Sequence, residues 1–204
     1  MTRLVPAFVF ILLLLIASCA GTEALDRKLG PRYEPETQSW IAVVRAVGGT
    51  GMWIVSRGYH EGDDFVAIAS NASFSHTSIL DLERSEVIEA VAAGVVVTPL
   101  DKYLRETHRL RVVRPRGWTA ERGTEALARA RSKIGAPYDY LGIVGVPDDD
   151  RFYCSELAAW SMGIVVDRPG PHRVLHPKKM HELGEILFDS GDRDAAPDEV
   201  AKAR

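Results

Sequence analysis

Three strand-like segments follow one another between residues 75 and 98, with only short turns between them. Residues 75–80 and 85–91 are rich in β-branched and apolar residues, and residues 81–84 have the length of a hairpin loop. Residues 94–98 form a third β-branched run directly after them. Helical patterns precede and follow this stretch. Because short turns join neighbouring strands antiparallel, the chain is predicted to be an α+β protein with an antiparallel sheet.

The length of the predicted hairpin loop determines which residues of its two strands face each other. If residues 81–84 form the loop, Leu80 pairs with Ser85 and His76 lies directly opposite Glu89. Directly opposed side chains share one face of a sheet, with Cβ atoms about 5 Å apart. The pattern therefore predicts an imidazole beside a carboxylate, with the intervening apolar residues on the other, core-facing side. A slip of one residue would separate the two groups.

The only internal cysteine, Cys154, lies where a helical pattern begins. Residues 146–150 form a turn-rich lead-in, and Leu157, Ala158 and Ser161 follow Cys154 at helical spacing. The first turn of a helix favours negative charge, and so favours thiolate, the nucleophilic form of cysteine. We interpret Cys154 as a candidate nucleophile. The alternative is a structural cysteine, since free cysteines are among the most buried residues.

The N-terminal segment has the pattern of a targeting signal. A basic residue precedes an apolar run over residues 4–16, which is too short for a spanning helix and ends shortly before Cys19. The four residues that end at Cys19, Ile-Ala-Ser-Cys, resemble the bacterial lipobox. The resemblance implies cleavage before Cys19 and lipidation of this cysteine, which would hold the protein on a membrane. An ordinary signal peptide with an incidental cysteine is the alternative.

This resemblance also implies a location and a domain organisation. We expect a lipid-anchored protein of the bacterial cell envelope, by resemblance to sorting patterns on the periplasmic face of the outer membrane. Residues 1–18 would be the signal peptide, 19–33 a tether, 34–188 one domain and 189–204 a disordered tail. The domain is further predicted to contain strands at 65–69, 108–114 (at an edge or rim) and 186–188, helices at 34–47, 119–134 and 177–183, and a short helix or turn at 99–106.

Composition and charge argue against several other classes of protein. The formal net charge is −3, and no long basic run interleaved with aromatic residues indicates a nucleic-acid partner. No second apolar stretch is long enough to span a bilayer. His172, His176 and His181 lie near one another, but their spacing matches no known ligand set. We therefore predict neither a metal site nor an organic cofactor.

Cys154, His76 and Glu89 together supply the three groups that thiol catalysis needs. An imidazole takes the thiol proton, and a third polar group orients the ring and stabilises imidazolium. The backbone N–H groups at a helix N-terminus can stabilise a developing oxyanion. Tyr138 or Tyr153 could add a hydroxyl donor to the same site.

Four short segments resemble the NlpC/P60 peptidases. Residues 135–138, Gly-Ala-Pro-Tyr, and 152–157, Phe-Tyr-Cys-Ser-Glu-Leu, are similar to the cysteine segment of that family. Residues 74–79 resemble its histidine strand, and residues 87–90 the strand that follows. Here the histidine precedes the cysteine, so the order is circularly permuted, as in the YiiX/YaeF-like amidases and the relatives of lecithin retinol acyltransferase. The resemblance covers about residues 60–190.

The resemblance implies a circularly permuted papain-like fold with the nucleophile Cys154 at a helix N-terminus. It implies that His76 acts as general base and then acid, that Glu89 orients it, and that Tyr138 is an oxyanion or substrate candidate. The implied activity is that of a thiol hydrolase acting on a peptide, amide or lipid substrate through an acyl-enzyme. Two alternatives stay open: a thiol acyltransferase or lipid-directed hydrolase on the same site, and a non-catalytic envelope lipoprotein that binds a ligand there.

Overall fold

The computed structural model describes residues 25–59, 61–70, 72–146, 148–164 and 174–193. The predicted signal peptide, Cys19 and residues 194–204 of the predicted tail lie outside the described residues. His172, one of the three clustered histidines, lies outside them as well.

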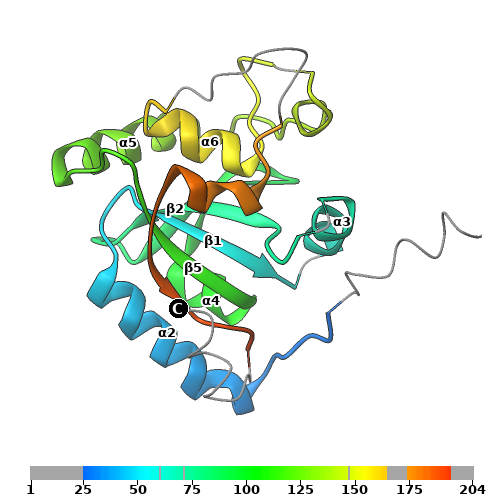
Figure 1. Cartoon of the computed structure of the whole chain (residues 1–204), viewed down its shortest axis with the longest axis vertical. Coiled ribbons are helices and arrows are strands. Elements are labelled where there is room, and N and C mark those ends of the chain that lie inside the picture. The colour runs from blue at the N-terminus through cyan, green and yellow to red at the C-terminus, as the bar shows by residue number, and fades with distance from the viewer. Residues whose placement is uncertain (1–24, 60, 71, 147, 165–173, 194–204) are drawn as a thin grey trace, which may run out of the picture.

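A six-stranded antiparallel sheet forms the centre of the molecule, with the strand order β4-β3-β2-β1-β5-β6 (Figure 1). The predicted α+β class with an antiparallel sheet is therefore confirmed. The strands are β1 Trp53–Gly58, β2 His76–Asp81, β3 Glu86–Val91, β4 Gly94–Pro99, β5 Thr107–Pro115 and β6 Gly184–Asp189. The helices are α2 Glu34–Val47, α3 Glu61–Ser70, α4 Leu100–Arg105, α5 Ala120–Ser132 and α6 Cys154–Ser161, with short 3₁₀ helices η1 Pro31–Tyr33, η2 Gly142–Val144 and η3 Pro177–Leu183.

Helices cover both faces of the sheet, because successive residues of its strands point to opposite sides. On β1, Trp53 and Val55 pack in the core that contains residues of α5, α6 and η3. Ile54, between them, packs in a second core with residues of α2 and α4. Figure 1 shows α5 and α6 above the sheet and α2 below it. The domain therefore has two apolar layers, one on each face.

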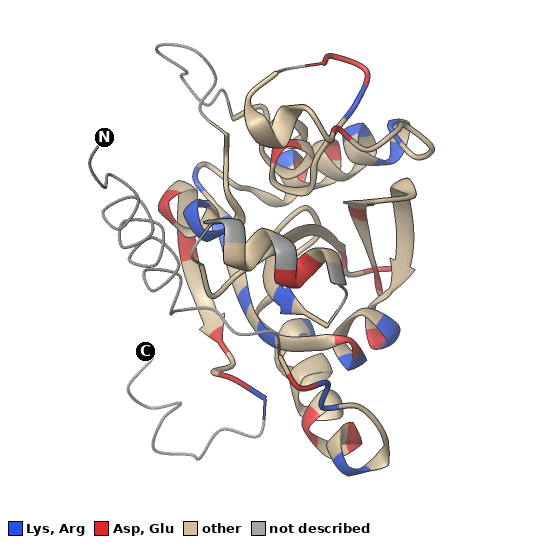
Figure 2. Ribbon diagram, turned by 90° about the vertical axis from the view of Figure 1, so that its right-hand side faces the viewer, with Lys and Arg blue, Asp and Glu red and all other residues tan. Residues whose placement is uncertain are grey.

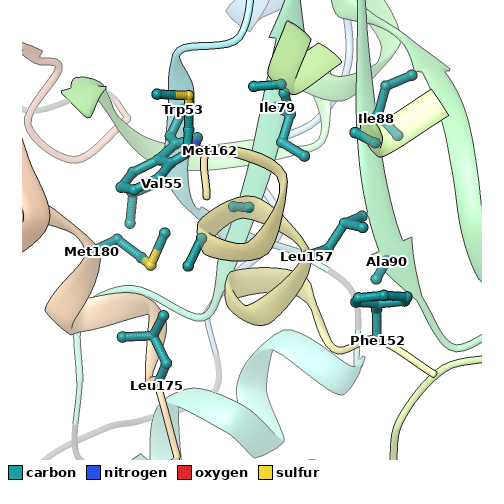
Figure 3. Close-up of a cluster of buried hydrophobic side chains, with 14 of the residues drawn as sticks. Trp53, Val55, Ile79, Ile88, Ala90, Phe152, Leu157, Met162, Leu175 and Met180 are labelled. Carbon is teal, nitrogen blue, oxygen red and sulfur yellow. The ribbon is translucent and has the colours of Figure 1, made fainter. Parts of the chain in front are cut away.

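The first of these cores fixes the position of α6. Figure 3 shows apolar side chains around α6 that come from the sheet, from Phe152 before the helix, and from Leu175 and Met180 after it. Leu157 of α6 is fully buried in this core with Ile79 of β2 and Ile88 of β3. Full burial of each such side chain contributes about 1.5–3 kcal/mol. The N-terminus of α6, where Cys154 lies, is thus held against the strands that carry His76 and Glu89.

Most predicted helices are present. Thr119 caps α5 as expected: its side chain accepts a hydrogen bond from the backbone N–H of Arg122 at 3.2 Å. The short helix or turn predicted at 99–106 is the helix α4, and its apolar residues Leu100, Tyr103 and Leu104 are buried as one face.

The strand predicted at residues 65–69 is wrong, since these residues belong to α3. Polar contacts hold this helix against the sheet. The buried guanidinium of Arg57 donates to the Asp63 backbone carbonyl at 2.6 Å and pairs with the Asp64 carboxylate. Ser75 Oγ donates to Asp63 Oδ1 at 2.6 Å. A short apolar run in the sequence does not distinguish a helix from a strand. In the structure, α3 is held by the contacts of Asp63 and Asp64, which the apolar pattern does not reveal.

The strand predicted at residues 108–114 is present as β5, but it is not an edge strand. It pairs with β1 on one side and with β6 on the other. The sequence pattern did not predict β1, and these two pairings make β5 a central strand.

The predicted domain end at residue 188 lies too early. Asp189 accepts hydrogen bonds from Arg109 Nε at 3.1 Å and Arg111 Nε at 2.7 Å. Arg193 is 0 % exposed, and its guanidinium lies over the Trp40 ring at 4.3 Å from the centroid. It donates to the backbone carbonyls of Thr107 at 2.8 Å and Leu104 at 2.7 Å, and to Thr37 Oγ1 at 2.9 Å. Residues 189–193 are therefore part of the domain.

Acidic and basic residues are interspersed along the ribbon (Figure 2). Within the part of the chain that the structure describes, no helix has the length and apolarity needed to cross a membrane.

Candidate active site

The β2–β3 hairpin brings His76 and Glu89 together in a register different from the predicted one. Ser78, not His76, is the direct partner of Glu89, and the loop comprises residues 82–85, with Ser85 at a φ of 53°. His76 is therefore the diagonal neighbour of Glu89. The shift changes the sum of paired residue numbers by an even number, so both side chains stay on one face of the sheet.

Despite this shift, the imidazole and the carboxylate form a short hydrogen bond. His76 Nε2 lies 2.7 Å from Glu89 Oε2, and the Glu89 side chain is 9 % exposed. The other carboxylate oxygen, Oε1, accepts a hydrogen bond from Thr98 Oγ1 of β4 at 2.5 Å. Because Nε2 is engaged with Glu89, Nδ1 is the ring nitrogen that remains for a third group.

That third group is Cys154 at the start of α6, whose interaction with His76 is the largest influence that raises the pKa of the imidazole. Burial alone would lower the pKa of His76, because it disfavours imidazolium. Interaction with Cys154, followed by the hydrogen bond to Glu89, acts in the opposite direction. The two interactions hold the pKa of His76 well above its ordinary value. The arrangement thus favours the protonated, imidazolium form of His76 beside the Glu89 carboxylate.

Cys154 is the first residue of α6 and is buried. The preceding residue, Tyr153, is extended, with a φ of −94° and a ψ of 165°. Its backbone N–H points to Glu156 Oε2 at 3.5 Å, so Glu156, to which the sequence assigned no role, caps the helix.

The two neighbours of Cys154 both bind the backbone of Leu175. Tyr153 Oη accepts a hydrogen bond from the Leu175 N–H at 3.0 Å, and Ser155 Oγ donates to the Leu175 carbonyl at 2.5 Å. Leu175 is buried in the same core as α6. The start of α6 is thus fixed on both sides of the thiol. Tyr153, one of two predicted hydroxyl donors, has a structural partner here.

Tyr138, the other predicted donor, lies beside the segment that leads into Cys154. It forms an isolated parallel bridge with Phe152, in which the Phe152 N–H donates to the Pro137 carbonyl at 3.2 Å. Burial, followed by the negative charge of Cys154, raises the pKa of Tyr138. Its phenol therefore stays protonated and is electrostatically sensitive to charge on the thiol.

Three polar residues near His76 and Glu89 were not among the residues predicted for the site: Tyr103, Ser56 and Thr98. Tyr103 of α4 has its ring centroid 6.2 Å from that of His76, and its hydroxyl lies 2.6 Å from Ser56 Oγ of β1. Burial raises the pKa of Tyr103 to about 12, so the phenol is neutral. Thr98 is the third. None of them carries a local sequence signal, because each reaches the site only through strand pairing or helix packing.

An exposed apolar loop adjoins Tyr138. Asp139 Oδ1 accepts from the backbone N–H groups of Leu141 at 3.1 Å and Gly142 at 2.7 Å, which fixes the turn. Ile143 of this loop packs against the core, whereas other side chains of the loop are exposed, with Val144 72 % exposed. The other exposed apolar residues of the loop are Tyr140, Leu141 and Val146.

The described residues contain no group of three histidine, cysteine or carboxylate side chains placed to hold a metal ion. His176 is partly buried, and burial and then Lys178 lower its pKa. His181 lies on η3.

Comparisons with known proteins place this geometry in context. A family described as "Permuted papain-like amidase enzyme, YaeF/YiiX, C92 family" matches residues 59–175. Among solved structures, the metalloprotein YiiX of Escherichia coli O157:H7 is similar, with 25% sequence identity and a TM-score of 0.50. This similarity covers 60% of this chain and 68% of that chain. No significant match was found among curated proteins.

Proposed function

The chain belongs to the permuted papain-like amidase family of YaeF and YiiX, and we propose that it is a cysteine hydrolase acting through Cys154, His76 and Glu89. The observation that carries the proposal is the position of His76, whose imidazole is hydrogen-bonded to Glu89 and whose pKa is raised chiefly by interaction with Cys154. This is the order of groups that thiol catalysis needs: nucleophile, base and orienting acid.

The proposed reaction has two halves. In the first, His76 holds the thiol proton, and the Cys154 thiolate attacks the carbonyl carbon of an amide, ester or thioester. The oxyanion receives hydrogen bonds from backbone N–H groups at the start of α6 and from the Tyr138 hydroxyl. His76 then protonates the leaving group, which departs and leaves a thioester on Cys154. In the second half, His76 deprotonates a water molecule, which attacks the thioester, and the thiol is restored with release of a carboxylic acid.

We also propose that the enzyme is anchored in the bacterial envelope by lipid on Cys19, on the periplasmic face of the outer membrane. The sequence pattern before Cys19 supports this location. Peptides, amides and lipids of the envelope are then the accessible substrates.

The similar protein YiiX is described as a metalloprotein. In this chain, the described residues offer no three-ligand group, and His76 and Glu89 are hydrogen-bonded to each other.

The exposed apolar loop at residues 140–146 favours one alternative, an acyltransferase or lipid-directed hydrolase on the same site. The loop follows Tyr138 directly and exposes four large apolar side chains, a surface suited to an acyl chain. In that case the acyl group would pass from Cys154 to an alcohol or amine instead of water.

A p-nitrophenyl ester tests the proposal. We expect a burst of nitrophenolate equal to the amount of enzyme, and an acyl adduct on Cys154 in peptide mass spectrometry. Cys154→Ala should abolish both, and His76→Ala should abolish the burst, whereas the control His181→Ala should retain it. An adduct that persists in water but is released by added glycerol or amine would identify an acyltransferase. Absence of an adduct, with iodoacetamide reactivity of Cys154 unaffected by His76→Ala, would instead favour the ligand-binding lipoprotein.

A further inference from the structure

Glu89 lies between two strands that each supply a diagonal hydrogen-bond donor. On β2 its direct partner is Ser78, and the donor is His76, two residues earlier. On β4 its direct partner is Val96, and the donor is Thr98, two residues later. Both strands run in the same direction beside β3, so the donors approach along opposite diagonals. Each carboxylate oxygen accepts from one of them.

From this arrangement we infer that Thr98 is a positioning residue of the active site, whose hydroxyl holds the Glu89 carboxylate in the orientation that aligns His76 with Cys154. The inference rests on the proposed cysteine-hydrolase function.

The geometry explains why a hydroxyl at this position has an effect at the thiol. The terminal torsion of a glutamate side chain is broad, so hydrogen bonds to both carboxylate oxygens define the carboxylate plane better than a bond to one of them. The 2.5 Å bond from Thr98 Oγ1 to Oε1 fixes the second oxygen. With both oxygens held, Oε2 stays beside Nε2 at 2.7 Å, which leaves Nδ1 available to Cys154. Hydrogen bonds to a buried carboxylate are of the strong, charge-assisted kind.

Thr98 is also well suited to a clean test. The titratable groups facing His76 come from three elements: Glu89 from β3, Tyr103 from α4 and Cys154 from α6. Replacing Thr98 changes none of these charges. Thr98→Val removes the hydroxyl, keeps the β-branched shape suited to a strand and lies at a half-buried position of β4.

The experiment measures the burst rate with a p-nitrophenyl ester, and the rate of Cys154 alkylation by iodoacetamide, across pH. In Thr98→Val we expect the burst rate to fall by about tenfold, the size expected for one lost hydrogen bond to a charged group. We also expect the alkaline limb of the alkylation profile to move to lower pH, because a misaligned Glu89 supports imidazolium less well. Thr98→Ser should restore both properties. The control Thr124→Val, which removes an exposed hydroxyl bonded to the Ala120 carbonyl at 3.0 Å, should resemble the wild type.

The outcomes separate this inference from the proposed function. If the wild-type enzyme shows no burst, the hydrolase proposal fails and the inference fails with it. If the wild type shows a burst but Thr98→Val matches it in rate and alkaline limb, only the positioning role is refuted. Failure of Thr98→Ser to restore the rate would also refute it, because packing rather than the hydroxyl would then matter. Should circular dichroism show that Thr98→Val is unfolded, Thr98→Ala removes the same hydroxyl and carries the same expectations.

Discussion

Replacing Glu89 by glutamine is expected to slow acyl-enzyme formation by about 10- to 150-fold while leaving the fold intact. The amide has nearly the shape of the carboxylate but no negative charge. Both known donors, His76 Nε2 and Thr98 Oγ1, bind carboxylate oxygens in the wild type, and glutamine offers one acceptor oxygen. The Thr98 hydroxyl can rotate to accept from the new amide group, so the oxygen can stay with His76. The expected loss is that of a charge-assisted hydrogen bond, about 1.5–3 kcal/mol, which corresponds to the stated range in rate.

The raised pKa of His76 predicts in which direction the pH profile of Glu89→Gln should move. The pKa of His76 lies well above 6.5, so imidazolium is present below that pKa and is lost as the pH rises through it. The alkaline limb of the wild-type profile should therefore lie well above pH 6.5. Glu89 is one of the causes that raise this pKa, and Cys154 is another. In Glu89→Gln the first is removed and the second is kept, so the alkaline limb should move to lower pH.

Burst kinetics with a p-nitrophenyl ester and iodoacetamide alkylation, both followed from pH 5 to 10, provide the assay. Glu125→Gln, an exposed glutamate on α5 with 66% side-chain exposure, is the matched control and should behave as the wild type. A Glu89→Gln enzyme with a burst rate within about twofold of wild type and an unmoved alkaline limb would refute the orienting role. So would an equal change in the control.

Four other changes test the remaining features. Tyr138→Phe should slow the ester burst by about 100-fold or more if its hydroxyl binds the oxyanion, but should leave iodoacetamide alkylation unchanged, since that reaction forms no oxyanion; equal effects on both reactions would contradict the assignment. Arg193→Met should lower the free energy of unfolding in urea by about 3 kcal/mol or more, because buried carbonyls lose their donors. A loss below about 1 kcal/mol would show that the hydrogen bonds of Arg193 are unimportant for stability. Gly142→Ala should destabilise by about 1–3 kcal/mol, because its new Cβ would lie 2.1 Å from Asp139 Oδ2; an unchanged melting temperature would count against this. Cys19→Ala should move the protein expressed in bacteria from the membrane to the soluble fraction, and retention in the membrane would argue against lipidation.

The pairing of His76 with Glu89 could be predicted because it depends on which face of the sheet each side chain occupies more than on the exact register of the two strands. The predicted loop was displaced by one residue, and the pairing shifted accordingly. An even change in the sum of paired numbers keeps every side chain on its face, and the diagonal reach of a glutamate spans the difference. The prediction thus failed in register and succeeded in which groups meet.

Other parts of the fold lacked a local signal. Every residue of β1 is buried, so the strand shows none of the alternation that marks a half-exposed strand. Arg193 lies in a polar stretch whose composition resembles disorder, and only its distant partners on α2, α4 and β5 make it part of the domain. Tyr103 lies within the segment 99–106 that was predicted to be a short helix or turn, but its nearness to His76 arises from the packing of α4 on the sheet.

The permuted element order has a consequence for the newly made chain. β2, β3 and β4 are consecutive and pair through short turns, so His76, Glu89 and Thr98 can meet through contacts local in sequence. The chain leaves the ribosome with its N-terminus first, so these residues emerge more than fifty residues ahead of Cys154. Under the proposed mechanism, the base and its carboxylate can thus be assembled before the nucleophile is made, and the site is complete only when α6 docks. A nascent or truncated chain that ends before residue 154 would carry an oriented imidazole but no capacity to acylate itself.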